Sequence, residues 1–150
     1  MKRFFSVLAL SILIVSLLTA AAPTPNTSIE LVEPTPAELL VLNDPPAPTP
    51  TLTMNVGETI IVSVQVTSDQ EFLSAMALPS FQFPGKGVVA VQGGDHQGRG
   101  TSATLQITFQ AKSPTTRMPN NVAPVHFVIG VRYLGGYVAV QDYLFNVTVP

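Results

Sequence analysis

The sequence predicts an all-β protein, an antiparallel β-sandwich of about seven strands behind a signal segment and a Pro-rich extended region. Several runs after Pro50 alternate between apolar and polar residues with a period of two, as half-buried antiparallel strands do. Charged residues make up only 11% of the chain, well below the roughly one quarter of an average globular domain. Thr, Ser, Gln and Asn fill the polar positions instead, which is typical of β-rich extracellular domains.

Residues 1–21 have the three parts of a signal peptide, which are a basic start, an apolar core and small residues at the end. These parts are Lys2 and Arg3, residues 4–18, and Thr19 to Ala21. We expect cleavage after Ala21, which leaves a protein that is secreted or held in the cell envelope. The alternative is that the segment is retained, because residues 4–22 approach the roughly 20 residues that span a bilayer. It would then be the membrane attachment of the protein.

Residues 22–50 form a Pro- and Thr-rich extension. Proline fixes φ and removes a backbone donor, so such a stretch favours extended conformations. Apolar pieces between the prolines leave two interpretations open. The extension is either a stiff linker with a first edge strand, or a segment that adds as a strand to a neighbouring subunit through residues 28–42.

Residues 51–150 contain the predicted sandwich. The clearest alternating runs are 51–55, 59–67, 102–111, 125–133 and 143–149. Val138 and Val140 have the opposite parity to Tyr143 and Phe145, so the pattern predicts a β-bulge near Gln141 and Asp142.

The turns and the middle of the domain are less uniform. Leu134, Gly135 and Gly136 predict a hairpin turn, because Gly readily takes positive φ. Residues 71–78 fit either a helical turn or a strand that ends at Pro79, and residues 88–91 predict a short strand. The strand topology of residues 69–100 stays open.

Residues 51–67, with a strand, a Gly-Glu-Thr turn and an alternating strand, resemble the opening of prokaryotic immunoglobulin-like surface domains. Residues 125–149 are similar to the last two strands of those domains, which include cell-adhesion-related and S-layer-associated types. The resemblance covers about two thirds of the chain and departs from the pattern over residues 69–100. It implies an immunoglobulin-like β-sandwich over residues 51–150 and the non-catalytic surface role that such modules have.

Composition argues against several functions. The chain contains no Cys, which excludes a disulfide, a thiol nucleophile and a Cys-bound metal. A net charge of −2 argues against a nucleic-acid partner, which needs a basic surface. The absence of Trp weakens the case for an aromatic sugar platform, and the few acidic residues are scattered.

The individual candidate residues favour non-catalytic interpretations. Asp95 and His96 lie in the Gly-rich stretch 93–100, which we interpret as a loop because adjacent side chains in a strand point to opposite faces. His126 and Arg132 share the polar phase of their strand, where solvation is the simplest role. Asn26 and Asn146 begin glycosylation triplets that matter only in a host that glycosylates exported proteins. No catalytic, cofactor-binding or metal-binding residue is predicted.

The expected protein is therefore a secreted or cell-surface structural or interaction module, not an enzyme, without a cofactor. Its expected partners are proteins or glycans at the cell surface, including further copies of itself. Two alternatives are a subunit of an extracellular filament joined by strand addition through residues 28–42, and a polysaccharide-binding accessory domain.

Overall fold

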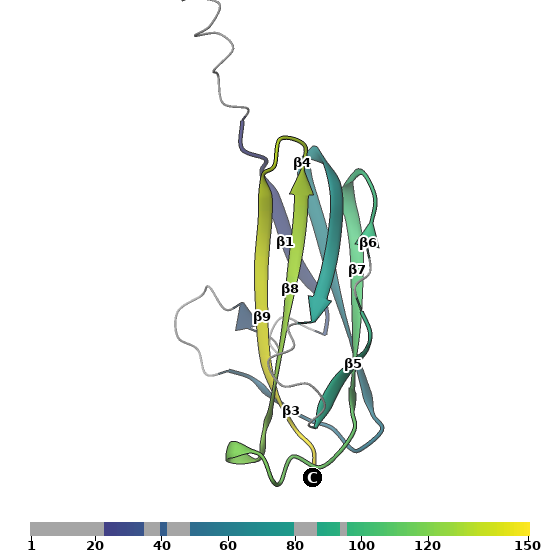
Figure 1. The fold of residues 1–150 in the computed structure, drawn as a ribbon, viewed down its shortest axis with the longest axis vertical. Coiled ribbons are helices and arrows are strands. Elements are labelled where there is room, and N and C mark those ends of the chain that lie inside the picture. The colour runs from purple at the N-terminus through teal and green to yellow at the C-terminus, as the bar shows by residue number, and fades with distance from the viewer. Residues whose placement is uncertain (1–22, 35–39, 42–48, 80–86, 94–95) are drawn as a thin grey trace, which may run out of the picture.

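The computed structural model describes residues 23–34, 40–41, 49–79, 87–93 and 96–150, with only the backbone of residues 40, 41 and 96. The predicted signal peptide lies outside these ranges. Within them the chain forms nine strands and one short 3-10 helix, Pro119–Asn121 (Figure 1). The strands are β1 Thr27–Glu33, β2 Leu40–Val41, β3 Thr51–Thr53, β4 Thr59–Pro79, β5 Val88–Gln92, β6 His96–Gln97, β7 Gly100–Ala111, β8 Ala123–Tyr133 and β9 Val138–Thr148. No helix in the described part is long and apolar enough to span a membrane.

The long strand β4 takes part in both layers of a β-sandwich. Its first half pairs with β7 and β1, and β7 also pairs with β5. Its second half pairs with β8 and β6, and β8 pairs with β9. The hydrogen-bonded order β2-β9-β8-β4-β7-β5 is therefore continuous although the strands form two layers (Figure 1). The predicted all-β sandwich is confirmed, with one parallel pairing, between β3 and β9.

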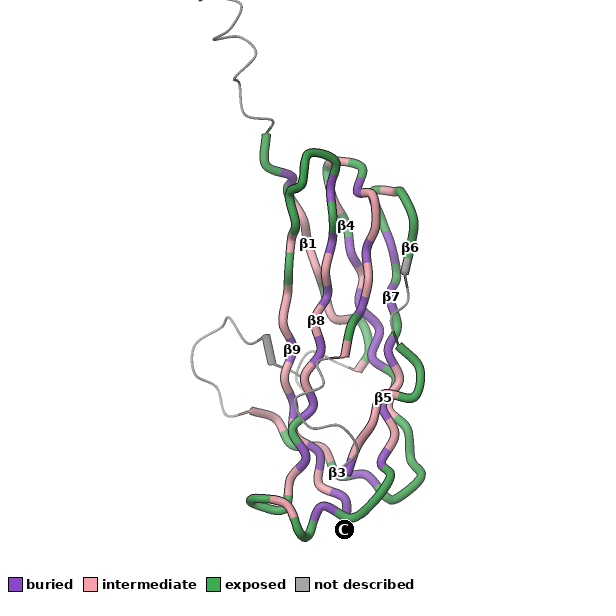
Figure 2. The backbone as a smooth tube through the Cα atoms, viewed as in Figure 1, coloured by how far each residue is buried: buried purple, intermediate pink, exposed green. Residues whose placement is uncertain are grey.

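The core lies between the two layers and is built from alternate residues of the long strands (Figure 2). Phe109 of β7 crosses the interface, with its ring centroid 5.8 Å from that of Phe127 in β8 and 5.7 Å from that of Phe145 in β9. Tyr143 stacks on Phe127 at 5.0 Å. Burial, with a smaller contribution from the negative charge of Glu30, raises the pKa of Tyr143 to about 12. The two contacts of Phe109 join the layers, whereas the Tyr143–Phe127 stack lies within the β8–β9 layer.

The parity change that we predicted in β9 lies in β4 instead. The β8–β9 register is unbroken from Ala123 opposite Val147 to Arg132 opposite Val138, so the predicted bulge near Gln141 and Asp142 is wrong. β4 shifts register between Phe72 and Ser74, and the inward positions change there from even to odd numbers. Because β9 keeps its alternation, Val138 and Val140 project outward instead of into the core.

The structure also shows which conformation residues 71–78 adopt, since they belong to β4. Residues 71–78 are strand, because they pair with β8 from Phe72 opposite Tyr133 to Leu78 opposite Val128. Of the two alternatives for residues 71–78, the strand is confirmed and the helical turn is wrong. The short strand that we predicted over residues 88–91 is confirmed as β5.

Part of the Pro-rich extension belongs to the sandwich. β1 pairs with β4 at the edge of its layer, and Ile29 and Leu31 pack against the core. The start of β1 is fixed by a 2.7 Å hydrogen bond between Thr27 Oγ1 and the Tyr133 hydroxyl. The described chain therefore begins at the same end of the sandwich as the β8–β9 hairpin, while the C-terminus lies at the other end (Figure 1).

Candidate functional site

The outer face of the β4–β7 layer is largely polar and internally hydrogen-bonded, and it also carries Ile61, which is 49% exposed. Gln65 of β4 donates to the Ser102 hydroxyl at 2.8 Å and accepts from Thr104 Oγ1 at 2.7 Å. Gln106 donates to the Ser63 hydroxyl at 3.2 Å. Gln65, Ser102 and Thr104 are exposed or half-buried. Ser63 is instead buried, so the hydrogen bond from Gln106 satisfies its hydroxyl away from solvent.

The outer face of the other layer is apolar over three adjacent strands. Leu78 of β4 is 47% exposed, and Val138 and Val140 of β9 are 51% and 52% exposed. Met76 of β4 and Val128 of β8 lie between them on the same face and are half-buried. We call these five residues the β8–β9 face. Large apolar side chains that gather in this way mark interaction sites more often than isolated ones do.

Strand register arranges this face in rows across the strands. The central row runs from Met76 through Gly130 to Val140. Gly130 has no side chain, and a Cβ added there would lie 3.9 Å from Met76 Cγ. The centre of the face is therefore low and borders a flexible thioether, which adapts to irregular partners.

Charged residues lie on either side of the central row. Arg132 and Val138 occupy the row nearest the hairpin, and Arg132 is exposed without an ion pair to any residue that the structure describes. Asp142 and Val128 occupy the opposite row. His126 Nε2 lies 3.0 Å from Asp142 Oδ1, so the expectation of a simply solvated histidine is wrong.

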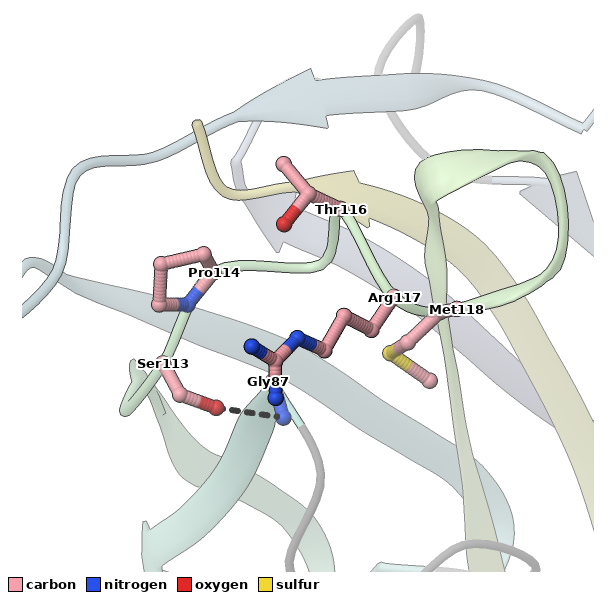
Figure 3. A pocket seen from close by; sticks show the side chains of 6 residues that line it. All are labelled: Gly87, Ser113, Pro114, Thr116, Arg117 and Met118. Carbon is pink, nitrogen blue, oxygen red and sulfur yellow. Dashed lines mark hydrogen bonds between the residues drawn. The ribbon is translucent and has the colours of Figure 1, made fainter.

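Two pockets lie at the end of the sandwich opposite the hairpin. One of about 580 Å³ is lined by Gly87, Ser113, Pro114, Thr116, Arg117 and Met118 (Figure 3). The other, of about 400 Å³, shares Arg117 and Met118 with it. Figure 3 shows the Arg117 guanidinium extending toward Gly87. Arg117 is exposed and is the sole charged residue among the described lining of either pocket, so these pockets offer an anion one charge and no acid–base pair.

The other sequence candidates do not form a site. Asp95 lies outside the described residues, and the backbone of His96 pairs with Met76. Asn26 is exposed, and its backbone N–H donates to Asp69 Oδ1 at 2.9 Å. Asn146 faces outward and lines the smaller pocket. Among the described residues, no group of His, Asp or Glu side chains is placed to hold a metal ion.

Sequence reasoning missed the β8–β9 face, although a signal for it was present. Val138 and Val140 occupy the phase of β9 that Asn146 and Thr148 also occupy, where polar residues are expected. We attributed that mismatch to a bulge. The observed register shows that it is an apolar surface.

Comparison with known proteins adds little to this site. No protein-family model and no curated protein matches the chain. A solved Niemann-Pick type C2 protein from the Japanese carpenter ant aligns with 87% of this chain and 96% of its own, at 13% identity and a TM-score of 0.36. A similarity at that level assigns neither a family nor a ligand.

Proposed function

We propose that this protein is an exported, non-catalytic β-sandwich module that acts by binding a protein surface through the β8–β9 face. The observation that carries the proposal is the contrast between the two outer faces. One carries a hydrogen-bonded polar ladder with Ile61 exposed beside it, and the other gathers Leu78, Val138 and Val140 over adjacent strands. Export is supported by the signal-like segment 1–21.

A protein partner suits this face better than a sugar does. Aliphatic side chains and Met form the β8–β9 face, whereas glycan platforms use aromatic rings. Tyr137 is the sole exposed aromatic residue in the described part, and it lies at the hairpin. A non-catalytic role is supported by His126, which is hydrogen-bonded to Asp142 and to no hydroxyl group among the described residues.

The test measures binding of the purified protein to the envelope of the cells that produce it. Three proteins are compared: the unchanged chain, the double variant Val138→Thr with Val140→Thr, and Val91→Thr. Val91 is 47% exposed and lies in a strand of the other layer, so it is a matched control. Thr keeps the β-branched shape while it removes apolar surface.

We expect the double variant to bind at least about tenfold more weakly than the unchanged chain, and Val91→Thr to bind equally well. Equal binding by all three proteins would contradict the proposal. If the unchanged chain and the double variant both bind to insoluble polysaccharide, the polysaccharide-binding alternative is favoured.

A second candidate function is assembly by strand addition through residues 28–42. It is favoured by the position of β1, which among the described strands pairs with β4 alone and so lies at a sheet edge. β1 is hydrogen-bonded to its own chain in this structure, so assembly would require that it pass to a neighbour.

Cysteines at paired positions test this exchange. Ser28 lies opposite Thr67, and the natural chain has no Cys. Oxidation of the Ser28→Cys, Thr67→Cys variant should give chains linked to one another if β1 is exchanged. If protein extracted from cells contains only disulfides between positions 28 and 67 of the same chain, strand addition is ruled out.

A further inference from the structure

Charged residues flank the β8–β9 face in an arrangement that is complementary to itself. Arg132 lies one row toward the hairpin from the central row of Met76, Gly130 and Val140, and Asp142 lies one row away on the other side. Successive rows on one face of a strand are about 7 Å apart. The face is therefore positive on one side of an apolar centre and negative on the other.

We infer that the β8–β9 face binds a second copy of this chain. The two copies pack face to face and antiparallel, about a two-fold axis that crosses the strands at the level of Gly130 and Val140. This inference rests on the proposed function, because it names the protein surface that the face binds.

The charges select this axis among the two-fold axes that lie in the interface. An axis across the strands reverses the order of the rows, so Arg132 of each copy comes level with Asp142 of the other. The two residues are on neighbouring strands about 4.8 Å apart, and packed sheets are about 10 Å apart, a gap that the long Arg side chain can cross. An axis along the strands would instead bring Arg132 opposite Arg132, and like charges disfavour that arrangement.

The apolar centre fits the same axis. Val140 lies beside Val140 of the second copy, and Met76 lies beside Met76. Gly130 leaves room in the middle of each face for these side chains. Burial of Val140, which is 52% exposed in the single chain, provides a hydrophobic contribution that the charges alone do not provide.

With three side chains about half exposed and two more deeply placed, the apolar part of the face is smaller than the roughly 800 Å² that each partner of a stable complex buries. We therefore expect a weak dimer, with a Kd on the order of 100 μM. Such a dimer would form where many copies are concentrated at a surface.

Sedimentation velocity on purified protein, produced by expressing the full chain, tests the dimer directly. Between about 10 μM and 1 mM the unchanged chain should shift from monomer to dimer. Val138→Thr with Val140→Thr should raise the Kd at least about tenfold, and Val91→Thr should leave it unchanged. A protein that is monomeric at 1 mM, or a dimer that the double variant does not weaken, would overturn the inference.

Charge reversal tests the antiparallel arrangement. Arg132→Asp alone should weaken the dimer at least about tenfold, and adding Asp142→Arg should restore it to within about threefold. The arrangement is wrong if the reversed pair is no stronger than the single variant. Far-UV circular dichroism of each variant shows whether it is folded, since Asp142→Arg also removes the partner of His126.

A cross-linking variant keeps the arrangement testable if Asp142→Arg fails to fold. Val140→Cys gives a chain with one thiol, close to the axis and so close to its copy. A short bis-maleimide should link Val140→Cys into dimers but leave Val91→Cys monomeric. Equal linking of both variants would contradict the antiparallel dimer. The protein could instead stay monomeric and still bind the envelope through Val138 and Val140. That outcome would contradict this inference but support the proposed function.

Discussion

At the scale of single residues, Gly87 has the tightest surroundings among the described glycines with positive φ. Its φ is +82°, and a Cβ there would lie 3.0 Å from Thr115 Cγ2 and 3.1 Å from the Ala123 Cβ. Its N–H donates to Ser113 Oγ at 3.3 Å, and its carbonyl accepts from the Lys112 N–H at 2.6 Å. A side chain would therefore strain the backbone and push on neighbours that are themselves packed.

We expect Gly87→Ala to lower the free energy of unfolding by about 1–3 kcal/mol, in urea titrations followed by circular dichroism. Gly98→Ala is the control, because Gly98 has open space around its Cβ position and no positive φ. Its effect should stay within about 0.5 kcal/mol. Equal losses in the two variants would contradict this account of Gly87.

Glu58 closes the turn between β3 and β4. Its carboxylate accepts the Asn55 backbone N–H at 2.6 Å and Asn55 Nδ2 at 3.0 Å. The backbone hydrogen bond, followed by the side-chain one, lowers the pKa of Glu58 below its usual 4.5. Because the folded pKa is below the unfolded one, the contribution is present above pH 4.5 and is lost as the pH falls through the folded pKa.

We therefore expect Glu58→Gln to flatten the decline in unfolding free energy between about pH 5 and pH 3. Asn55→Ala should flatten it only in part, since the backbone hydrogen bond remains. Urea titrations at several pH values measure both slopes, and an unchanged slope in Glu58→Gln would show that another group is responsible.

At the scale of elements, β1 depends on contacts that the chain makes far from it in sequence. The Tyr133 hydroxyl at the end of β8 joins Thr27 Oγ1 at 2.7 Å and donates to Ser68 Oγ of β4 at 2.8 Å. One phenol thus holds the start of β1 to both layers.

Tyr133→Phe should cost about 0.5–1.5 kcal/mol of unfolding free energy and raise hydrogen exchange in β1 more than in β9. Tyr137→Phe is the matched control, because its hydroxyl has no hydrogen-bond partner among the described residues. If β1 exchanges no faster in Tyr133→Phe than in Tyr137→Phe, the phenol does not anchor the strand.

At the scale of the whole molecule, β4 makes the two layers one hydrogen-bonded unit. It pairs with β7 and β1 in one layer and with β8 and β6 in the other. Phe109 joins the layers again through the core, where it contacts Phe127 and Phe145. Neither layer can open without the loss of contacts in both.

We therefore expect unfolding in a single transition. Far-UV circular dichroism and tyrosine fluorescence should give coincident urea curves. Phe109→Ala should lower the free energy of unfolding by about 3–5 kcal/mol, and both curves should move together to lower urea. Separate transitions for the two signals would show that the layers unfold independently.

The sequence by itself determined the alternating strands, the inward faces of β7 and β8 and the Gly-Gly hairpin, because a period of two and positive φ are local properties. Tertiary structure alone decided which strand carries the register break. The shift in β4 at Phe72 depends on its pairing with β8, and the parity of Val138 and Val140 fits either a bulge or an outward face until the pairing of β9 with β8 is known. The same pairing decided that these valines form one apolar surface with Met76 and Leu78, since residues more than 50 positions apart become neighbours only across hydrogen-bonded strands.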